Sequence, residues 1–394
     1  MFEQEKKMQF SQILEHMADS LDIPESSYKD AEDRYRAVGR WLDREDSPLA
    51  VFNPEIYPQG SFRLGTVVKP VSQKDEYDID LVCQLDISQL AITQQTLKEM
   101  VGDRLRANET YAAMLDKEGR RCWTLNYADS AMFHMDILPA IPDDYRWLLG
   151  LGVPFDLARH AVCITDKKRW DIDPDWPRSN PKGYDLWFRE RMKIVFAQRR
   201  KMFAEQMRTN IEDVPEYKVK TPLQRAIQIL KRHRDLMFEN DPDDKPISII
   251  ITTLASHAYN NQEDLFDALS SIINGMPEYI SPVNGKVWIS NPVNPRENFA
   301  DKWQENPEKE LKFRRWLFKA QEDISSAFSE RGINNVTDRL KPAFGERATN
   351  EAVKRMGDEF RVKRESGLLK MSVATGILGN FGSTHVREHT FHGS

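Results

Sequence analysis

The sequence predicts an α+β protein, in which a small mixed sheet with helices is followed by a largely helical module. Two patterns support this: short segments with alternating apolar residues occur before residue 142, and longer segments with helical spacing follow residue 184. The chain has 394 residues, long enough for two such parts. Charged residues make up 30% and hydrophobic residues 40%, which is typical of a folded globular protein.

The chain is predicted to open with an amphipathic helix, because apolar residues recur at helical spacing. These residues are Phe10, Ile13, Leu14, Met17 and Leu21. A second helix is expected over about 27–43, with Ser26 and Ser27 as candidate caps. Strands are expected over 77–85, 121–126 and 132–138, with a helix over 90–105 and a turn at 127–130. Pro139 and Pro142 are expected to end the third strand, since proline cannot donate to a ladder.

The second half of the chain differs from the first in composition and in the spacing of its apolar residues. Residues 170–182 are rich in Asp, Pro and Trp and are expected to form a surface loop or linker. Helices are then predicted over 184–207, 222–238, 248–259, 263–273 and 308–328. Residues 376–394 are rich in Gly, His and Thr, which favours a flexible tail. The predicted domains are therefore 1–165, 166–375 and 376–394.

Composition and charge disfavour several functional classes. The formal net charge of −6 disfavours a broad nucleic-acid-binding surface, which needs clustered Lys and Arg. Cys83, Cys122 and Cys163 have no metal-ligand or redox spacing, so reduced, buried thiols are expected. No secretory or membrane-spanning apolar run is found, so a cytoplasmic protein without a membrane partner is expected.

A candidate site begins at Gln59-Gly60-Ser61 and continues at Asp78-Ile79-Asp80. A Gly-Ser turn can offer backbone N–H groups and a hydroxyl to a phosphate. Two aspartates spaced i, i+2 on a strand point to the same side, where hard divalent cations can bind.

A third carboxylate is expected from Asp136. Phe133, Met135 and Ile137 alternate on the side of their strand that should face the core, which turns His134 and Asp136 to the other side. Three carboxylates beside a phosphate-binding turn supply what metal-assisted nucleotidyl transfer needs.

Each part also has an ordinary explanation. An Asp-x-Asp pair is usually a solvated strand edge, and a Gly-Ser pair is usually a turn or cap. Arg63 either contacts phosphate or is an exposed helix residue, and the second interpretation is favoured. His134 is expected to be a packed or surface residue and not a base. The tail histidines are expected to belong to a flexible segment and not to a metal site: His385, His389 and His392. The order of parts favours the functional interpretation.

The segments 59–61, 78–80 and 134–142 resemble the bacterial cGAS/DncV-like nucleotidyltransferases, the oligonucleotide cyclases of anti-phage CBASS systems. The first motif is shared by all polymerase-β-like nucleotidyltransferases. Later segments narrow the resemblance, which covers about residues 57–328. The family's linker and the helix after it resemble residues 169–170, 180–182 and 185–188. Its donor-phosphate helix and the next helix resemble residues 229–235 and 246–248. A loop shared with oligoadenylate-synthase-like enzymes resembles residues 291–298.

The resemblance implies a role for each matching residue. Asp78 and Asp80 would hold two Mg²⁺ ions, and Asp136 would bind the catalytic ion and help to activate the acceptor 3′-hydroxyl. Gly60 and Ser61 would hold the donor's terminal phosphates, with Gln59 orienting the turn or touching the nucleotide. From the helical domain, Lys231 would reach the same phosphates and Ser248 would add a hydroxyl. The alternatives are that Lys231 lies on a solvated basic face and that Ser248 is a helix cap.

The implied fold is a polymerase-β-like core plus a helical domain like that of oligoadenylate synthase or poly(A) polymerase, as two lobes around a central cleft. The implied enzyme uses Mg²⁺, or Mn²⁺, to make a cyclic di- or trinucleotide from ATP, GTP or both, with release of pyrophosphate. Implied partners are nucleoside triphosphates, a downstream effector, and a ubiquitin-transfer-like enzyme that conjugates the tail at Gly393-Ser394. A nucleic-acid activator is not expected.

Two rival functions share parts of this site. A non-cyclising nucleotidyltransferase would act on RNA or protein and should carry a basic polymer-binding surface. A binding module would recognise a nucleotide and signal without turnover, but it has no need of three carboxylates. The product, its ring size and the base preference cannot be deduced from the sequence.

Overall fold

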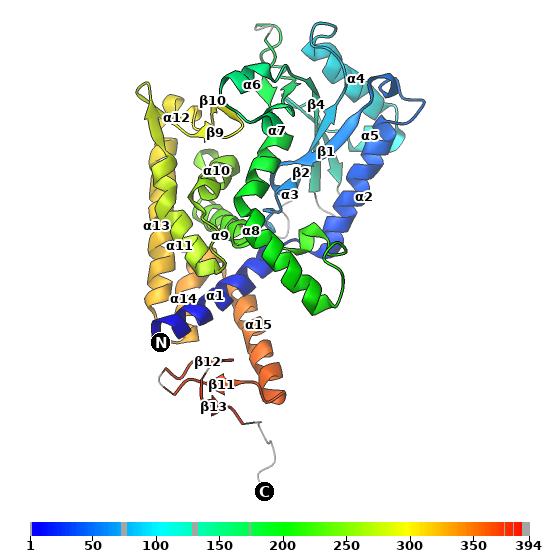
Figure 1. The fold of residues 1–394 in the computed structure, drawn as a ribbon. Coiled ribbons are helices and arrows are strands. Elements are labelled where there is room, and N and C mark those ends of the chain that lie inside the picture. Colours follow the sequence, from blue (N-terminus) through cyan, green and yellow to red (C-terminus); the bar gives the residue numbers. More distant parts are fainter. Residues whose placement is uncertain are drawn as a thin grey trace. The chain divides into compact units, whose positions relative to one another are not determined.

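The structure is a computed structural model that describes residues 2–71, 77–127, 133–172, 175–373, 375–380 and 382–387 (Figure 1). The chain divides into two compact units. The sheet unit comprises Ile23–Lys193 and Trp288–Phe299, and the helical unit comprises Met1–Asp22, Ile194–Val287 and Ala300–Ser394. These units do not coincide with the predicted segments 1–165, 166–375 and 376–394.

A six-stranded mixed sheet forms the centre of the sheet unit, in the order β1-β2-β4-β5-β6, with β3 also paired to β4. The strands are β1 (Glu55–Gln59), β2 (Tyr77–Gln84), β3 (Trp123–Tyr127), β4 (Phe133–Pro142), β5 (Val162–Ile164) and β6 (Arg178–Ser179). β2 and β4 run parallel, and the other pairs are antiparallel. The three predicted strands are therefore confirmed, and the sheet extends beyond them.

One face of this sheet is covered by α2 (Glu25–Leu42) and α4 (Gln94–Arg106). Ile79 of β2 and Met135 of β4 lie fully buried in the same hydrophobic cluster as residues from both helices. On the opposite face a smaller apolar cluster occupies only part of the sheet. The members of the smaller cluster are Tyr57, Val82, Leu138, Ala140, Val162 and Ile164. Polar side chains can therefore occupy the remainder of that face.

Two local predictions in the sheet unit are wrong. Helix α2 begins after Pro24, which makes no side-chain capping bond, so Ser26 and Ser27 lie inside the helix. β4 does not end at Pro139; it continues to Pro142, the other proline expected to end it, so only the expectation for Pro139 is wrong. β3 pairs with β4 only as far as Ile137, and β5 pairs only from Ala140, so Pro139 falls between the two partners.

The described part of the predicted linker over 170–182, residues 170–172 and 175–182, is also more ordered than expected. It contains β6, which extends the sheet, and the first residues of α8 (Pro181–Met207). β9 (Ser290–Asn291) and β10 (Asn294–Asn298) form an antiparallel pair in the same unit. The remaining short helices of the unit are α3 (Gly60–Arg63), α5 (Glu109–Met114), α6 (Arg146–Gly150) and α7 (Phe155–Ala158).

The helical unit is built around α9 (Pro222–Met237), which contacts α1, α10, α11, α13 and α14. The bounds are α1 (Phe2–Leu21), α10 (Ser248–Ala258), α11 (Leu265–Gly275), α12 (Lys302–Glu305), α13 (Pro307–Ser329), α14 (Ile333–Phe344) and α15 (Glu346–Glu365). Phe10 of α1 packs edge-on against Phe266 and Phe328. The predicted helices are confirmed, whereas α14 and α15 were not predicted.

The predicted flexible tail is wrong for the part that the structure describes. β12 (Leu378–Gly379) and β13 (Thr384–His385) both pair with β11 (Lys370–Met371). His389, His392 and the proposed conjugation site at Gly393-Ser394 lie outside the described residues. Within the described residues, no helix has both the length and the apolar character to cross a membrane.

Gly102 of α4 should be essential for the contact between α4 and β3. A Cβ atom there would lie 3.0 Å from Nε1 of Trp123 and closer still to two carbons of the indole ring. We expect Gly102→Ala to lower the free energy of unfolding by about 1–3 kcal/mol, because the core would be overpacked. Thermal and urea unfolding measure the change.

The matched control is Gly39→Ala in α2, where a Cβ would make ordinary contact, 3.5 Å from Cβ of Ile56. This variant should be neutral or stabilised by roughly 0.4–1 kcal/mol, since alanine restricts the unfolded chain. Equal shifts of the unfolding midpoint in the two variants would contradict the packing argument.

Candidate active site

Four polar side chains form one row across the sheet. The residue pairs in register are Gln59 with Asp80 (β1–β2), Asp80 with Asp136 (β2–β4), and Asp136 with Thr124 (β4–β3). The neighbours of these residues along the strands face the core under α2 and α4, so the row lies on the opposite face. The predicted orientation of Asp136 away from the core is confirmed, and Asp80 lies on the same face.

A second row lies one step along the same face. Asp78 of β2 is in register with His134 of β4, which is in register with Asn126 of β3. Asp78 is exposed, and Nδ1 of His134 lies 2.7 Å from Oδ1 of Asn126. In the tautomer that carries its proton on Nδ1, His134 donates to this amide oxygen. The histidine is therefore a packed neighbour of the carboxylates, as the sequence suggested.

Gly60 lies directly against the Asp80 carboxylate. Its φ of +63° is in the left-handed region, and an added Cβ would be 3.3 Å from Cγ of Asp80 and closer still to one carboxylate oxygen. Both the backbone conformation and the space therefore require glycine. Gly60 and Ser61 open the four-residue helix α3, and the first N–H groups of a helix have no intrahelical acceptor. The predicted phosphate-binding turn and the predicted metal ligand thus adjoin each other.

The turn is fastened to α8 by a buried carboxylate. Nε of Arg63 donates to Oδ2 of Asp185 at 2.7 Å, and Nε of Arg189 donates to Oδ1 of the same residue at 2.8 Å. The Asp185 side chain is only 4% exposed, while that of Arg63 is 44% exposed. The interpretation of Arg63 as an exposed helix residue is confirmed, but its partner Asp185 was not foreseen.

Asp136 is held by the neighbouring strand. Oγ1 of Thr124 donates to Oδ1 of Asp136 at 2.5 Å. The thiol of Cys122 is close by, and burial together with the Asp136 carboxylate raises the pKa of this thiol to about 11. It is therefore protonated at neutral pH. Cys83 and Cys163 are buried free thiols, as expected, whereas Cys122 is only half-buried.

Sequence reasoning missed Thr124 and Asn126. Both lie on the polar face of β3, between the buried residues Trp123, Leu125 and Tyr127. The same alternation that identified Asp136 would have placed them on this face. Their partners on β4, however, depend on a strand register that the sequence does not specify.

The donor set fits Mg²⁺. Among the described residues, no group of three Asp, Glu, His or Cys side chains is arranged to hold a metal ion. Mg²⁺ is usually bound through one or two carboxylates plus substrate phosphates, however, and seldom by an all-protein cage. Asp80 and Asp136 stand opposite each other on neighbouring strands, which run about 4.8 Å apart. Two carboxylates beside a phosphate-binding turn match that mode of binding.

Lys231 and Ser248 belong to the helical unit, so their approach to the carboxylates stays a prediction. Lys231 is only 4% exposed, and the rest of the basic run at 232–234 is buried with it, so the alternative of a solvated face is wrong. The helix-cap alternative for Ser248 is also wrong, because the N-cap of α10 is Ile247. The Ser248 hydroxyl accepts a hydrogen bond from Nη1 of Arg234 at 2.8 Å.

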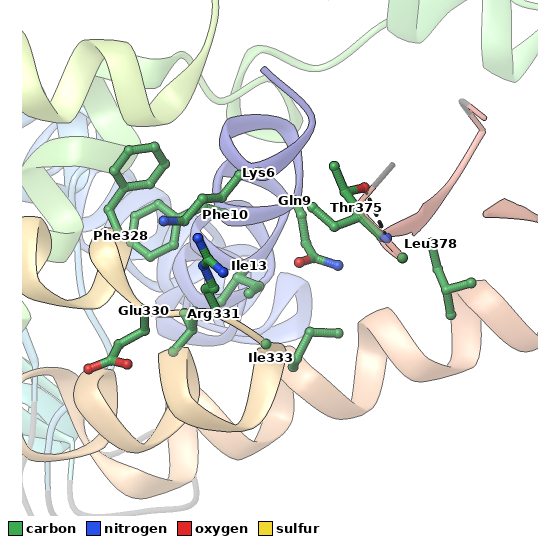
Figure 2. Close-up of a pocket in the computed structure, with 14 residues that line it drawn as sticks. Lys6, Gln9, Phe10, Ile13, Phe328, Glu330, Arg331, Ile333, Thr375 and Leu378 are labelled. Atoms are coloured by element: carbon green, nitrogen blue, oxygen red, sulfur yellow. Dashed lines mark hydrogen bonds between the residues drawn. The ribbon is translucent and has the colours of Figure 1, made fainter. Parts of the chain in front are cut away.

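A separate cavity of about 390 Å³ lies in the helical unit. Figure 2 shows Lys6, Gln9 and Phe10 of α1 on one wall, with Ile333 of α14 and Leu378 near the C-terminus on others. None of the predicted site residues lines this cavity.

A polymerase-β-like nucleotidyltransferase is defined by these features together: the mixed sheet, the carboxylates on its face opposite α2 and α4, and the adjoining Gly-Ser turn. The family profile described as "Cyclic GMP-AMP synthase DncV-like, nucleotidyltransferase domain" matches residues 54–139. The chain is also 30% identical over 393 residues to the "c-di-GMP synthase" of Roseivirga ehrenbergii, with 98% of each chain covered. The chain therefore belongs to the cGAS/DncV-like nucleotidyltransferases, or CD-NTases.

Further relatives support this assignment. The chain is 25% identical over 405 residues to the "Cyclic dinucleotide synthase CdnG" of Bradyrhizobium diazoefficiens, covering 96% of this chain and 93% of the relative. The solved structure of that CD-NTase in complex with GTP shares the fold, with a TM-score of 0.68 and 23% identity over 89% of this chain and 99% of the other. The Escherichia coli MS115-1 CdnC structure with ATP also shares the fold, with a TM-score of 0.57 and 16% identity over 85% of this chain and 96% of the other.

The buried ion pair beneath the turn gives a stability prediction. Asp185→Asn leaves Arg63 and Arg189 without their shared carboxylate, and we expect it to lower the free energy of unfolding by about 1–3 kcal/mol. Hydrogen exchange of the amides at 60–66 should also become faster, because α3 loses its attachment to α8.

The control is Asp103→Asn, which removes an exposed pair with Arg106. Exposed pairs contribute about 0–1 kcal/mol, so this variant should resemble the wild type. Unchanged exchange at 60–66 in Asp185→Asn would show that the ion pair does not hold the turn.

Proposed function

We propose that this protein joins two nucleoside triphosphates into a cyclic dinucleotide, with GTP as a substrate. The observation that carries the proposal is the 30% identity over 98% of the chain to a relative named "c-di-GMP synthase". A second full-length relative is named "Cyclic dinucleotide synthase CdnG", and a structure of CdnG contains GTP. The row formed by Gln59, Asp80 and Asp136 supports it chemically, because carboxylates and a phosphate-binding turn adjoin on one face.

Each step of the proposed reaction forms one phosphodiester bond. The acceptor 3′-hydroxyl gives up its proton to solvent and its oxygen attacks the α-phosphorus of the donor. The bond from that phosphorus to the bridging oxygen breaks, and pyrophosphate leaves. A second step of the same kind closes the ring. When bound, Mg²⁺, or Mn²⁺ in its place, would neutralise phosphate charge and make the hydroxyl easier to deprotonate.

The side chains of this protein supply binding and orientation. The ions would be held on the sheet face opposite α2 and α4 by Asp78, Asp80 and Asp136. The N–H groups and hydroxyl of Gly60-Ser61 would bind the donor's terminal phosphates, with Gln59 beside them in the row. Lys231 and Ser248 of the helical unit would contribute an ammonium group and a hydroxyl to the same triphosphate. Positioning and charge neutralisation account for most of the catalysis in this scheme.

The cellular role is proposed from the family alone. It comprises anti-phage signalling in the cytoplasm, a downstream effector that binds the product, and conjugation of the C-terminal tail by a ubiquitin-transfer-like enzyme.

The product and the carboxylates can be tested together. We expect the purified protein, given four labelled nucleoside triphosphates and Mg²⁺, to form a small product that resists phosphatase. Asp80→Asn and Asp136→Asn should each lower its rate of formation by at least about 100-fold, because charge stabilisation at the phosphate is lost. The matched control is Asp338→Asn, an exposed aspartate of α14 that should leave the rate unchanged. Long or protein-linked label, or phosphatase-sensitive label only, would contradict the proposal.

Gly60 provides a separate test of the turn. Gly60→Ala should lower kcat by roughly 100-fold, since the new Cβ would displace the Asp80 carboxylate by a fraction of an ångström or more. Gly285→Ala is the control, because Gly285 also has a positive φ, +76°, but has nothing within 4 Å of an added Cβ. That control should lose about 1–2 kcal/mol of stability and keep its kcat. Equal loss of kcat in both variants would refute a specific role for the space at Gly60.

A further inference from the structure

Thr124 is the one residue of the row that the sequence did not single out as a site residue. It lies directly opposite Asp136 on β3, and its hydroxyl donates to Oδ1 of that carboxylate at 2.5 Å. We propose that Thr124 is a positioning residue that holds Asp136 so that Oδ2 is presented to the catalytic metal ion. The inference rests on the proposed function, because it concerns the ion that the reaction would use.

The chemistry of the pair supports this role. A carboxylate has two oxygens that can each bind an ion, and its terminal torsion is soft. A hydroxyl hydrogen bond to an ionised oxygen is among the stronger hydrogen bonds in proteins. With Oδ1 engaged by Thr124, Asp136 is fixed in rotation and binds an ion through Oδ2. Partners of this kind orient metal-binding side chains in many proteins.

Thr124 is itself held rigidly. Threonine is β-branched and has a restricted χ1 on a strand. The adjacent Trp123 is buried, and its Nε1 donates to the carbonyl of Lys98 at 2.8 Å. The Lys98 side chain is fully buried, and its ammonium group donates back to the carbonyls of Gly119 and Arg120, just before β3. The start of β3 is therefore fastened to α4, which fixes the hydroxyl that faces Asp136.

The next row shows why the role is specific to Thr124. Asn126 makes the equivalent contact with His134, which is not a predicted metal ligand. Two polar residues of β3 thus each contact a polar residue of β4, but only Thr124 contacts a candidate metal ligand.

The test compares Thr124→Val with Thr124→Ser in the full-length protein. Valine keeps the branched shape and removes the donor, whereas serine keeps the donor. The first readout is the affinity for Mn²⁺ alone, measured by electron paramagnetic resonance in the absence of nucleotide, so that it does not depend on turnover. We expect Thr124→Val to weaken Mn²⁺ binding by roughly 10- to 100-fold relative to the wild type. Thr124→Ser should bind Mn²⁺ about as tightly as the wild type does.

The matched control is Thr349→Val in α15. Thr124 is half-buried and Thr349 is fully buried, but the hydroxyl of Thr349 likewise donates a hydrogen bond, to the carbonyl of Gly345 at 2.9 Å. The same group is therefore removed at a position that carries no predicted site residue. This variant should bind Mn²⁺ as the wild type does. Thermal unfolding of all three variants identifies any loss of fold.

The second readout is steady-state kinetics of product formation. Thr124→Val should lower kcat and leave KM for GTP unchanged, because the hydroxyl contacts Asp136 and not the nucleotide. Wild-type Mn²⁺ affinity in a folded Thr124→Val protein would overturn the inference, as would failure of serine to restore binding or absence of Mn²⁺ binding in the wild type. If the wild type makes no cyclic product but the loss of Mn²⁺ binding in Thr124→Val is observed, the proposed function fails and the inference stands.

Discussion

The candidate site depends on the parallel pairing of β2 with β4, which sets Asp80 opposite Asp136. A shift of one residue in this register would turn either strand's polar residues into the core under α2 and α4. The fully buried residues Ile79, Met135 and Ile137 prevent such a shift, because each would be exposed by it. The apolar core therefore fixes the strand register that sets the two carboxylates opposite each other.

The other parts of the site are fastened to this strand pair. Gly60 brings the turn against Asp80, and the buried Asp185 carboxylate ties α3 to α8 through Arg63. On the far side, Thr124 joins β3 to Asp136. The predicted phosphate-binding and metal-binding groups are thus carried by strands and by a braced turn. Supports of this kind keep reacting groups within a small fraction of an ångström of one another.

Much of this could be predicted from sequence, because alternation along a strand is local information. The alternation of apolar residues around Asp136 correctly predicted the face of the sheet on which this residue lies. The Thr124–Asp136 contact could not be predicted, since it depends on the register of the two strands, which the predicted turn at 127–130 does not specify. The burial of Lys231 was likewise hidden, because a basic run on a helix is usually exposed, and only the contacts of α9 with other helices show otherwise. β12 and β13 are strands of only two residues, and they lie in a segment whose richness in Gly, His and Thr is typical of a flexible tail.

We propose above all that Asp80 and Asp136 bind a common metal ion on the sheet face opposite α2 and α4. The most direct measurement is anomalous X-ray scattering from crystals of the protein grown with Mn²⁺ and a non-hydrolysable GTP analogue. The account predicts an anomalous peak between the two carboxylates, with the phosphates of the analogue beside Gly60 and Ser61. A Mn²⁺ peak elsewhere, with none between Asp80 and Asp136, would contradict it.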